Sequence, residues 1–253
     1  MKRIVSFILC VLMAAALLAG CGSRKSRTTW VIAVDGDFSP FVCADADGKA
    51  AGLDVEILDA IARDQNFRYE LRPSDWDTAM SVFTSHQAQA LMGSIASSQA
   101  RIDEGWFFSD SFYEGVTQSM AMEPSSDTNT LEDLAGKAVA VVSGTLGADY
   151  AKSVKDEYGF SIATFSDSHS MYAAVLKGRA AACFEDTPAL RDSIAGGVAL
   201  EMVPGSEGAA SDYCVAICDE KDQPFLELFN QGLANIRANG VYDAILARYA
   251  DSL

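Results

Sequence analysis

The stretch LMGSIASSQARIDEGWFFSDSFY, residues 91–113, carries the clearest signs of both fold and site. It begins as the apolar end of a strand, breaks at Gly93 into small residues, and then reaches Arg101. Small residues after a strand let a ligand approach backbone N–H groups, and a following helix N-terminus adds partial positive charge. An arginine beside such a loop offers a planar fork that suits a carboxylate. The stretch predicts a carboxylate-sized anion site on an α/β scaffold; the alternative is an exposed arginine after a Ser-rich turn.

The N-terminus has the pattern of a secretory signal. Lys2 and Arg3 precede an apolar run, and small residues then lead to Cys21. The sequence Leu-Ala-Gly-Cys at 18–21 resembles a bacterial lipobox, in which the cysteine is lipidated and becomes the new N-terminus. A retained membrane helix is the weaker alternative, because the apolar segment is only about 17 residues long. We expect a signal peptide at 1–20, lipid on Cys21, a polar tether at 21–29, and an extracytoplasmic protein held at the cell membrane.

The chain is strongly acidic, with a formal net charge of −16. This balance argues against nucleic acid or an anionic lipid surface as a partner. It also makes a local positive site necessary for any anionic ligand, since the overall field repels one. We expect a monomer.

The cysteines and histidines do not indicate a metal or cofactor site. Beyond Cys10 and Cys21, four scattered cysteines remain, too few for a stapled mini-protein or a metal cluster. One disulfide among them stays open, because pairing cannot be read from sequence. Both histidines lie in polar surroundings and are expected to face solvent. No cofactor and no metal are expected. The residues concerned are Cys43, Cys183, Cys214, Cys218, His86 and His169.

Strands and helices alternate along the rest of the chain, which favours βαβ units and ligand sites at the carboxyl ends of parallel strands. Asp54 is expected to cap a helix, and Asp75 to open the next one. A strand, a small-residue loop and a helix occur once in each half of the chain, at 90–101 and at 138–147. Other expected strands cover 30–34, 67–71, 180–184 and 213–217, and other helices cover 171–177, 225–236 and 242–249.

Seven short motifs then resemble one family, the polar-amino-acid solute-binding proteins of bacterial ABC importers (extracellular solute-binding family 3), with glutamine-binding proteins especially similar. The resemblance covers about 30–249, and each motif is weak alone but strong in order. They are DFSPF at 37–41, GLDV at 52–55, DWD at 75–77, Arg101 with FSDSFY at 108–113, SGT at 143–145, GR at 178–179 through EDTP at 185–188, and NGVY at 239–242.

The resemblance implies the two-lobe fold of type II periplasmic binding proteins, in which each lobe is a mostly parallel sheet flanked by helices. Lobe 1 would comprise 30–119 and 214–253, and lobe 2 would comprise 120–213. The lobes would close like a hinge on an amino acid held in the cleft. Because ligand charges are met from both lobes, binding favours the closed state.

The resemblance also assigns residue roles. Arg101 would bind the ligand α-carboxylate with backbone groups near Ser98, and Thr145 with Gly144 would cap that carboxylate. Asp186 would take the α-ammonium. The remaining expected contacts are an acceptor near Ser94, an aromatic sandwich of Phe38 and Trp76, and a side-chain contact at Asp35.

Structural alternatives exist for several of these residues. Phe38 and Trp76 could be core aromatics, Asp186 and Thr145 could cap helices, and Asp35 could be a solvated turn residue.

The expected function is therefore to bind a polar amino acid and deliver it to a membrane permease with its ATPase, without catalysis. An acidic pocket wall with no lysine argues against an acidic ligand and leaves neutral and cationic amino acids open. One alternative is a ligand-sensing lipoprotein that signals to a membrane partner. Another is an enzyme like the cyclohexadienyl dehydratases, with Glu185 or Asp186 as the acid.

Overall fold

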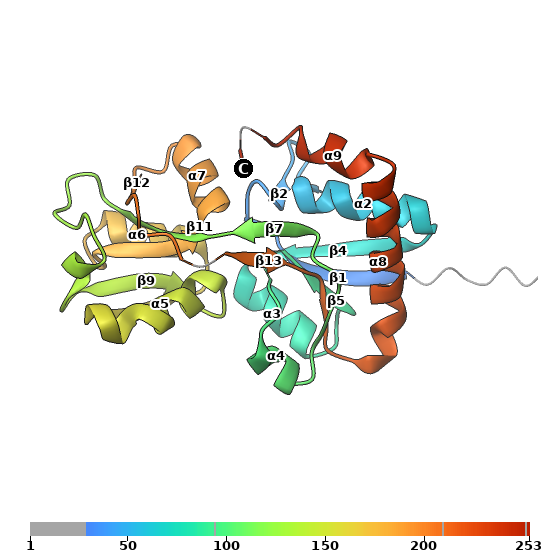
Figure 1. The fold of residues 1–253 in the computed structure, drawn as a ribbon, viewed down its shortest axis with the longest axis horizontal. Coiled ribbons are helices and arrows are strands. Elements are labelled where there is room, and N and C mark those ends of the chain that lie inside the picture. The colour runs from blue at the N-terminus through green and yellow to red at the C-terminus, as the bar shows by residue number, and fades with distance from the viewer. Residues whose placement is uncertain (1–28, 94, 209, 251) are drawn as a thin grey trace, which may run out of the picture.

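The computed structural model describes residues 29–93, 95–208, 210–250 and 252–253. Their strands form two separate five-stranded sheets that lie side by side, each with its own helices (Figure 1). The α/β fold with two lobes is confirmed. We call the sheet nearer the N-terminus and its helices the first lobe, and the other the second lobe. The expected signal peptide, the lipid site at Cys21 and nearly all of the tether lie outside the described residues.

The first sheet is mixed, with strand order β4-β1-β5-β14-β6. The first three strands are parallel, and the last two are added by antiparallel pairing. Their bounds are β1 Thr29–Asp35, β4 Arg68–Ser74, β5 Ala90–Met92, β6 Phe107–Phe108 and β14 Ala216–Ile217.

Alternation along β1 explains why helices cover both faces of this sheet. Ile32 and Val34 belong to one core cluster with α2 (Leu53–Gln65) and α8 (Gln223–Ala238), while Ala33 belongs to another with α3 (Trp76–Thr84). Successive strand residues point to opposite faces, so a strand that is apolar throughout needs a helix on each side.

The second sheet repeats this plan, with order β10-β9-β11-β8-β12. Again three strands are parallel and two are added by antiparallel pairing. The bounds are β8 Gln118–Met122, β9 Ala138–Val142, β10 Ser161–Phe165, β11 Ala182–Asp186 and β12 Glu201–Met202. Val139 and Val141 face α5 (Leu146–Tyr158), whereas Ala140 and Val142 face α6 (Ser168–Leu176).

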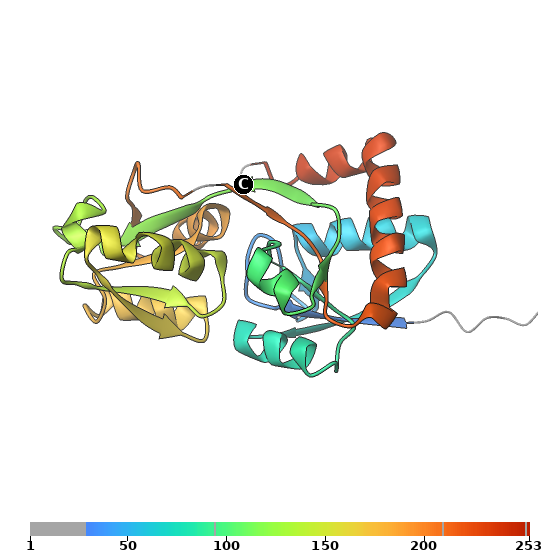
Figure 2. The same cartoon turned by 60° about the horizontal axis from the view of Figure 1, so that its bottom comes forward.

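The shorter elements complete the two lobes. In the first lobe, α8 lies at the side away from the second sheet, and α9 packs on α8 and runs back toward the second lobe (Figures 1 and 2). The second lobe has α7 against β11 and β8. Their bounds are β2 Cys43–Ala44, β3 Ala50–Ala51, α4 Gln99–Asp103, the 3-10 helix η1 Glu132–Leu134, α7 Thr187–Ala195, the 3-10 helix η2 Glu220–Asp222 and α9 Val241–Leu246.

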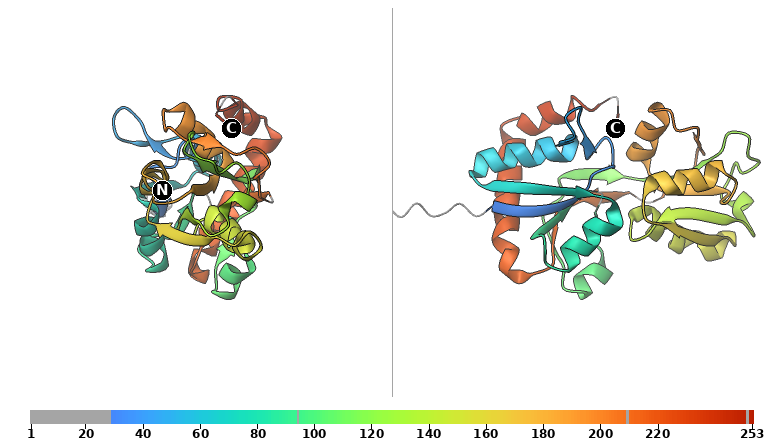
Figure 3. Two further views of the ribbon diagram at one scale, coloured as in Figure 1. Left: turned by 90° about the vertical axis from the view of Figure 1, so that its left-hand side faces the viewer. Right: turned by 180° about the vertical axis from the view of Figure 1, so that it is seen from behind.

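Two antiparallel strands, β7 (Tyr113–Val116) and β13 (Ser211–Tyr213), run between the lobes (Figures 1 and 3). The proposed boundary at 119/120 falls inside β8, so the chain enters the second sheet at about residue 118. The single strand expected at 213–217 is wrong, because the chain forms β13, leaves the ladder at Cys214 and Val215, and resumes as β14.

The helix expected to have Asp54 as its cap begins earlier in the chain. Gly52 is the N-cap of α2, and Asp54 lies within its first turn with 1% of its surface exposed. Gly52 adopts a φ of 120°, and a Cβ there would lie 2.3 Å from the carbonyl oxygen of Phe41. This close approach explains why glycine starts the helix.

Candidate functional site

The candidate site lies where the carboxyl ends of the parallel strands of both sheets face each other. Loops after β1, β4 and β5 come from the first lobe, and loops after β9, β10 and β11 come from the second. In open α/β sheets ligands sit at this edge, because the loops and helix N-termini there converge on one space. The strand–loop–helix pattern found in each half of the sequence therefore leads to one place.

Arg101 joins the two lobes directly. Its Nη1 donates to the carbonyl oxygen of Ala96 at 2.7 Å, and its Nη2 donates to that of Gly144, in the second lobe, at 2.9 Å. The guanidinium also lies over the ring of Trp106, 5.7 Å from its centroid. Burial lowers the pKa of Arg101. The ordinary pKa of an arginine is so high that the guanidinium stays charged. A half-buried cation in an acidic protein is thus held at the cleft.

Trp76 makes the second direct contact between the lobes. Its indole Nε1 donates to the carbonyl oxygen of Ser143 at 2.9 Å, and only 2% of the residue is exposed. Asp75, the N-cap of α3, holds the start of this helix by accepting from the backbone N–H of Thr78 at 3.0 Å. The ring is therefore fixed at the cleft by its own helix and by the opposite lobe.

Asp186 is fully buried at the end of β11. Its carboxylate accepts hydrogen bonds from the hydroxyl of Tyr213 and from the side-chain amide of Gln118, the latter at 3.2 Å. Although it occupies the N-cap position of α7, its side chain makes no capping bond. The helix-cap alternative therefore does not account for this carboxylate, and these two partners lie on β13, which connects the lobes, and on β8 of the second sheet.

Thr145 and Ser98 both cap helices at the site. The Thr145 hydroxyl accepts from the backbone N–H of Ala148 at 3.3 Å, and that of Ser98 accepts from the N–H of Arg101 at 3.3 Å. Gly144 precedes Thr145 with a φ of 74°, which glycine adopts without strain. The first-turn N–H groups of a helix that are not used in capping lack an intrahelical partner, and such groups suit a carboxylate.

The other expected site residues divide into three cases. Phe38 is 5% exposed and stacks on Phe41 with centroids 5.5 Å apart, as a core aromatic would, and its contact with a ligand stays a prediction. Asp35 is partly buried and lines a hollow discussed next. Ser94 lies outside the described residues.

An acidic hollow of about 380 Å³ opens beside Asp35. The pKa of Asp35 is raised to about 6, mainly by burial. The hydrogen bond from the backbone N–H of Asp37 lowers this pKa, whereas the negative charges of Asp37, Asp75 and Asp167 raise it. Asp167 comes from the second lobe, so carboxylates of both lobes meet here. The residues lining the hollow are Asp35, Gly36, Asp37, Pro73, Ser74, Asp75 and Asp167.

Two further side chains at the cleft were not assigned as ligand contacts from sequence. Glu185 precedes Asp186 and is 3% exposed, and its Oε2 accepts from the hydroxyl of Ser168 at 2.5 Å. The available signal was position, since Glu185 is the last residue but one of the third parallel strand, β11, and Ser168 follows the edge strand β10.

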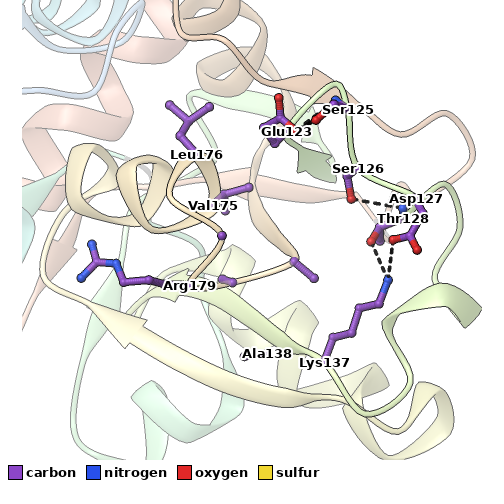
Figure 4. A pocket seen from close by; sticks show the side chains of 13 residues that line it. Glu123, Ser125, Ser126, Asp127, Thr128, Lys137, Ala138, Val175, Leu176 and Arg179 are labelled. Atoms are coloured by element: carbon purple, nitrogen blue, oxygen red, sulfur yellow. Dashed lines mark hydrogen bonds and ion pairs between the residues drawn. The ribbon is translucent and has the colours of Figure 1, made fainter.

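A larger hollow of about 700 Å³ lies at the other end of the second sheet, near the start of β9 (Figure 4). Lys137, one of the two cationic residues that line it, is already engaged, because it donates to Asp127 Oδ1 at 3.1 Å and to Thr128 Oγ1 at 2.9 Å. Arg179 extends away from Lys137. This end has the amino ends of the parallel strands, so it lacks the convergent loops of the cleft.

Within the described residues, no helix is long and apolar enough to span a membrane. Across the same ranges, no cluster of three or more histidine, cysteine or acidic side chains is arranged to hold a metal ion. Cys43, Cys183, Cys214 and Cys218 are all free thiols, which closes the disulfide question left open by the sequence.

Residues 30–252 match the family described as bacterial extracellular solute-binding proteins, family 3. The chain is 24% identical to the lysine/arginine/ornithine-binding periplasmic protein of Escherichia coli K12, with 95% of this chain and 96% of that protein covered. It is 33% identical to the second substrate-binding domain of a putative amino acid ABC transporter from Streptococcus pneumoniae, with coverages of 87% and 99% and a TM-score of 0.58. A mutant of ArgBP from T. maritima gives 25% identity, coverages of 90% and 97%, and a TM-score of 0.77.

Proposed function

We propose that this chain, which belongs to the bacterial extracellular solute-binding proteins of family 3, binds a polar amino acid between its lobes for an ABC importer. One arrangement carries the proposal: a cation, Arg101, and a buried carboxylate, Asp186, lie in opposite lobes, where the carboxyl ends of the parallel strands of the two sheets face each other. An α-amino acid presents the complementary pair of charges. Ligand charge satisfied from both lobes favours closure, and closure is the signal that a permease can recognise.

Each end of the ligand has its own set of groups. Arg101 and the N–H groups beside Thr145 and Ser98 would hold the α-carboxylate. Asp186 would hold the α-ammonium, and Trp76 would pack on the aliphatic part.

The hollow beside Asp35 favours a cationic ligand side chain over a neutral one. The acidic residues Asp35, Asp37, Asp75 and Asp167 line it, and none of the described residues lining it is basic. Charge complementarity excludes an acidic side chain, because like charges at an interface cost several kcal/mol. The relative whose name specifies lysine, arginine and ornithine is consistent with this choice.

Delivery to the membrane completes the proposal. The lipid on Cys21 and the short polar tether would keep the protein near its permease and ATPase, as a monomer. The homologues compared above are named as binding proteins, which fits a role without catalysis.

Calorimetric titration with the twenty amino acids and prephenate tests the proposal. We expect one or a few polar amino acids to bind, and Arg101→Ala to weaken them by about 3–5 kcal/mol, more than a hundredfold in Kd, because a buried ligand charge loses its partner.

Arg63→Ala is the matched control, since that arginine is 79% exposed on α2 and pairs with Asp59 at 3.3 Å. Unchanged affinity in Arg101→Ala would refute the site, and turnover of prephenate would favour the enzyme alternative.

A further inference from the structure

We propose that Glu185 determines selectivity for a cationic amino acid and gives up a proton to solvent when that cation binds. This inference rests on the proposed function and goes further, because it names the residue that distinguishes cationic from neutral side chains. It also gives binding a measurable proton stoichiometry.

Glu185 occupies the right place for a side-chain contact. It is the last residue but one of β11, directly before Asp186, at the carboxyl edge of the sheet that faces the first lobe. Its partner Ser168 begins α6, and the preceding residue, Asp167, lines the acidic hollow. A ligand anchored by its α-ammonium at Asp186 and extending into the hollow would pass this carboxyl group.

The two oxygens of Glu185 have hydrogen-bond donors but no cation among the described residues. Ser168 Oγ donates to Oε2 at 2.5 Å, and the backbone N–H of Asp186 donates to Oε1 at 3.1 Å. None of the ion pairs in the described part of the chain includes Glu185. A carboxylate 3% exposed and lacking a counter-ion is costly in its ionised form.

The charges that act on Glu185 add to this cost. Burial, and then the neighbouring Asp186, raise the pKa of Glu185 well above its usual range, and Asp35 across the cleft acts in the same direction. The hydrogen bonds from Ser168 and from the N–H of Asp186 oppose the shift. The other titratable groups facing it are the buried hydroxyl of Tyr172 on α6 and the thiol of Cys183 on β11, both neutral near pH 7.

A proton and a ligand cation are therefore alternatives at this carboxyl group. Near neutral pH the group holds a proton, so a neutral side chain meets a neutral acid. An ammonium or guanidinium group supplies the missing positive charge, the carboxyl ionises, and its proton passes to the buffer. One positive charge replaces another, so the net charge of the buried site is the same before and after the cation binds.

Titration calorimetry in buffers of different ionisation enthalpy tests this directly. Arginine and lysine should release about one proton per ligand at pH 7, and glutamine should release none. The Kd of the cationic ligand should fall as pH rises from 7 to 8.5, where Asp35 is already ionised.

The variant Glu185→Gln keeps the shape and removes the titration. We expect it to abolish proton release and to weaken arginine or lysine about tenfold or more, while glutamine changes less than about threefold. Retained glutamine binding shows that the variant is folded. Ser168→Ala provides a second test, because losing this donor should raise the pH at which the cation binds well.

Three results would overturn the inference: proton release that persists in Glu185→Gln, arginine affinity that is unchanged in it, or a wild-type protein that binds neutral amino acids alone. Each of these leaves amino-acid binding intact. Failure of the proposed function is different, because then no amino acid binds the wild-type protein.

Discussion

Asp54 is expected to make the protein less stable as pH rises, and Asp54→Asn should remove this dependence. The carboxyl group is 1% exposed in the first turn of α2, and neither oxygen has a hydrogen-bond partner among the described residues. Burial alone raises the pKa of Asp54 to about 8. In the unfolded chain the pKa returns to about 4.

The direction follows from proton counting. Between about pH 4 and 8 the folded protein holds a proton on Asp54 that the unfolded chain has released, so a higher pH favours unfolding. Each pH unit lowers the free energy of unfolding by about 1.4 kcal/mol, or about 5 kcal/mol over the whole interval. Local relaxation reduces this upper bound, and the contribution is constant below about pH 4 and above about pH 8.

Urea unfolding followed by tryptophan fluorescence, at about pH 5, 6, 7 and 8, measures the effect across the interval in which the proton is held. An asparagine side chain has the same shape as the acid and no charge, so the difference between wild type and Asp54→Asn isolates one group from other buried acids. The variant should be less pH-dependent, and its relative stability should rise with pH. Asp47→Asn, at an exposed loop position, is the control. If the free energy of unfolding changes with pH by the same amount in the wild type and in Asp54→Asn, the reasoning is refuted.

Two further predictions concern closure and anchoring. Trp76→Phe keeps an aromatic ring but loses the N–H that donates to Ser143. The ligand Kd should rise about two- to tenfold, and small-angle scattering should show that the variant without amino acid is less compact than the wild type. If neither quantity changes, this hydrogen bond does not support closure. Cys21→Ala should abolish incorporation of labelled fatty acid and move the protein from the membrane fraction to the soluble one; a variant that stays membrane-bound would point to a retained N-terminal helix instead.

Local signals predicted the regular elements well. The apolar run at 138–142 became β9 with those bounds, because a strand with helices on both faces must be apolar at every position. The caps at Asp75 and Thr145 also followed from the sequence, since each side chain bonds to an N–H three residues ahead. The cap predicted at Asp54 was wrong, because the chain bends at Gly52 to pack against Phe41, a contact that the local pattern does not record.

The sequence by itself determined the order of strands and helices, the repeated strand–loop–helix plan, and the residue types that suit an amino acid. These depend on periodicity and on contacts within a few residues. Only the tertiary structure decided which groups meet. Trp76 and Ser143 are 67 positions apart, and Arg101 and Gly144 are 43 apart, yet each pair is joined across the cleft. Tertiary packing also brings Ser168 to Glu185 and forms the acidic hollow. The hollow exists because the carboxyl edges of the two sheets face each other, and no short-range sequence pattern records that packing.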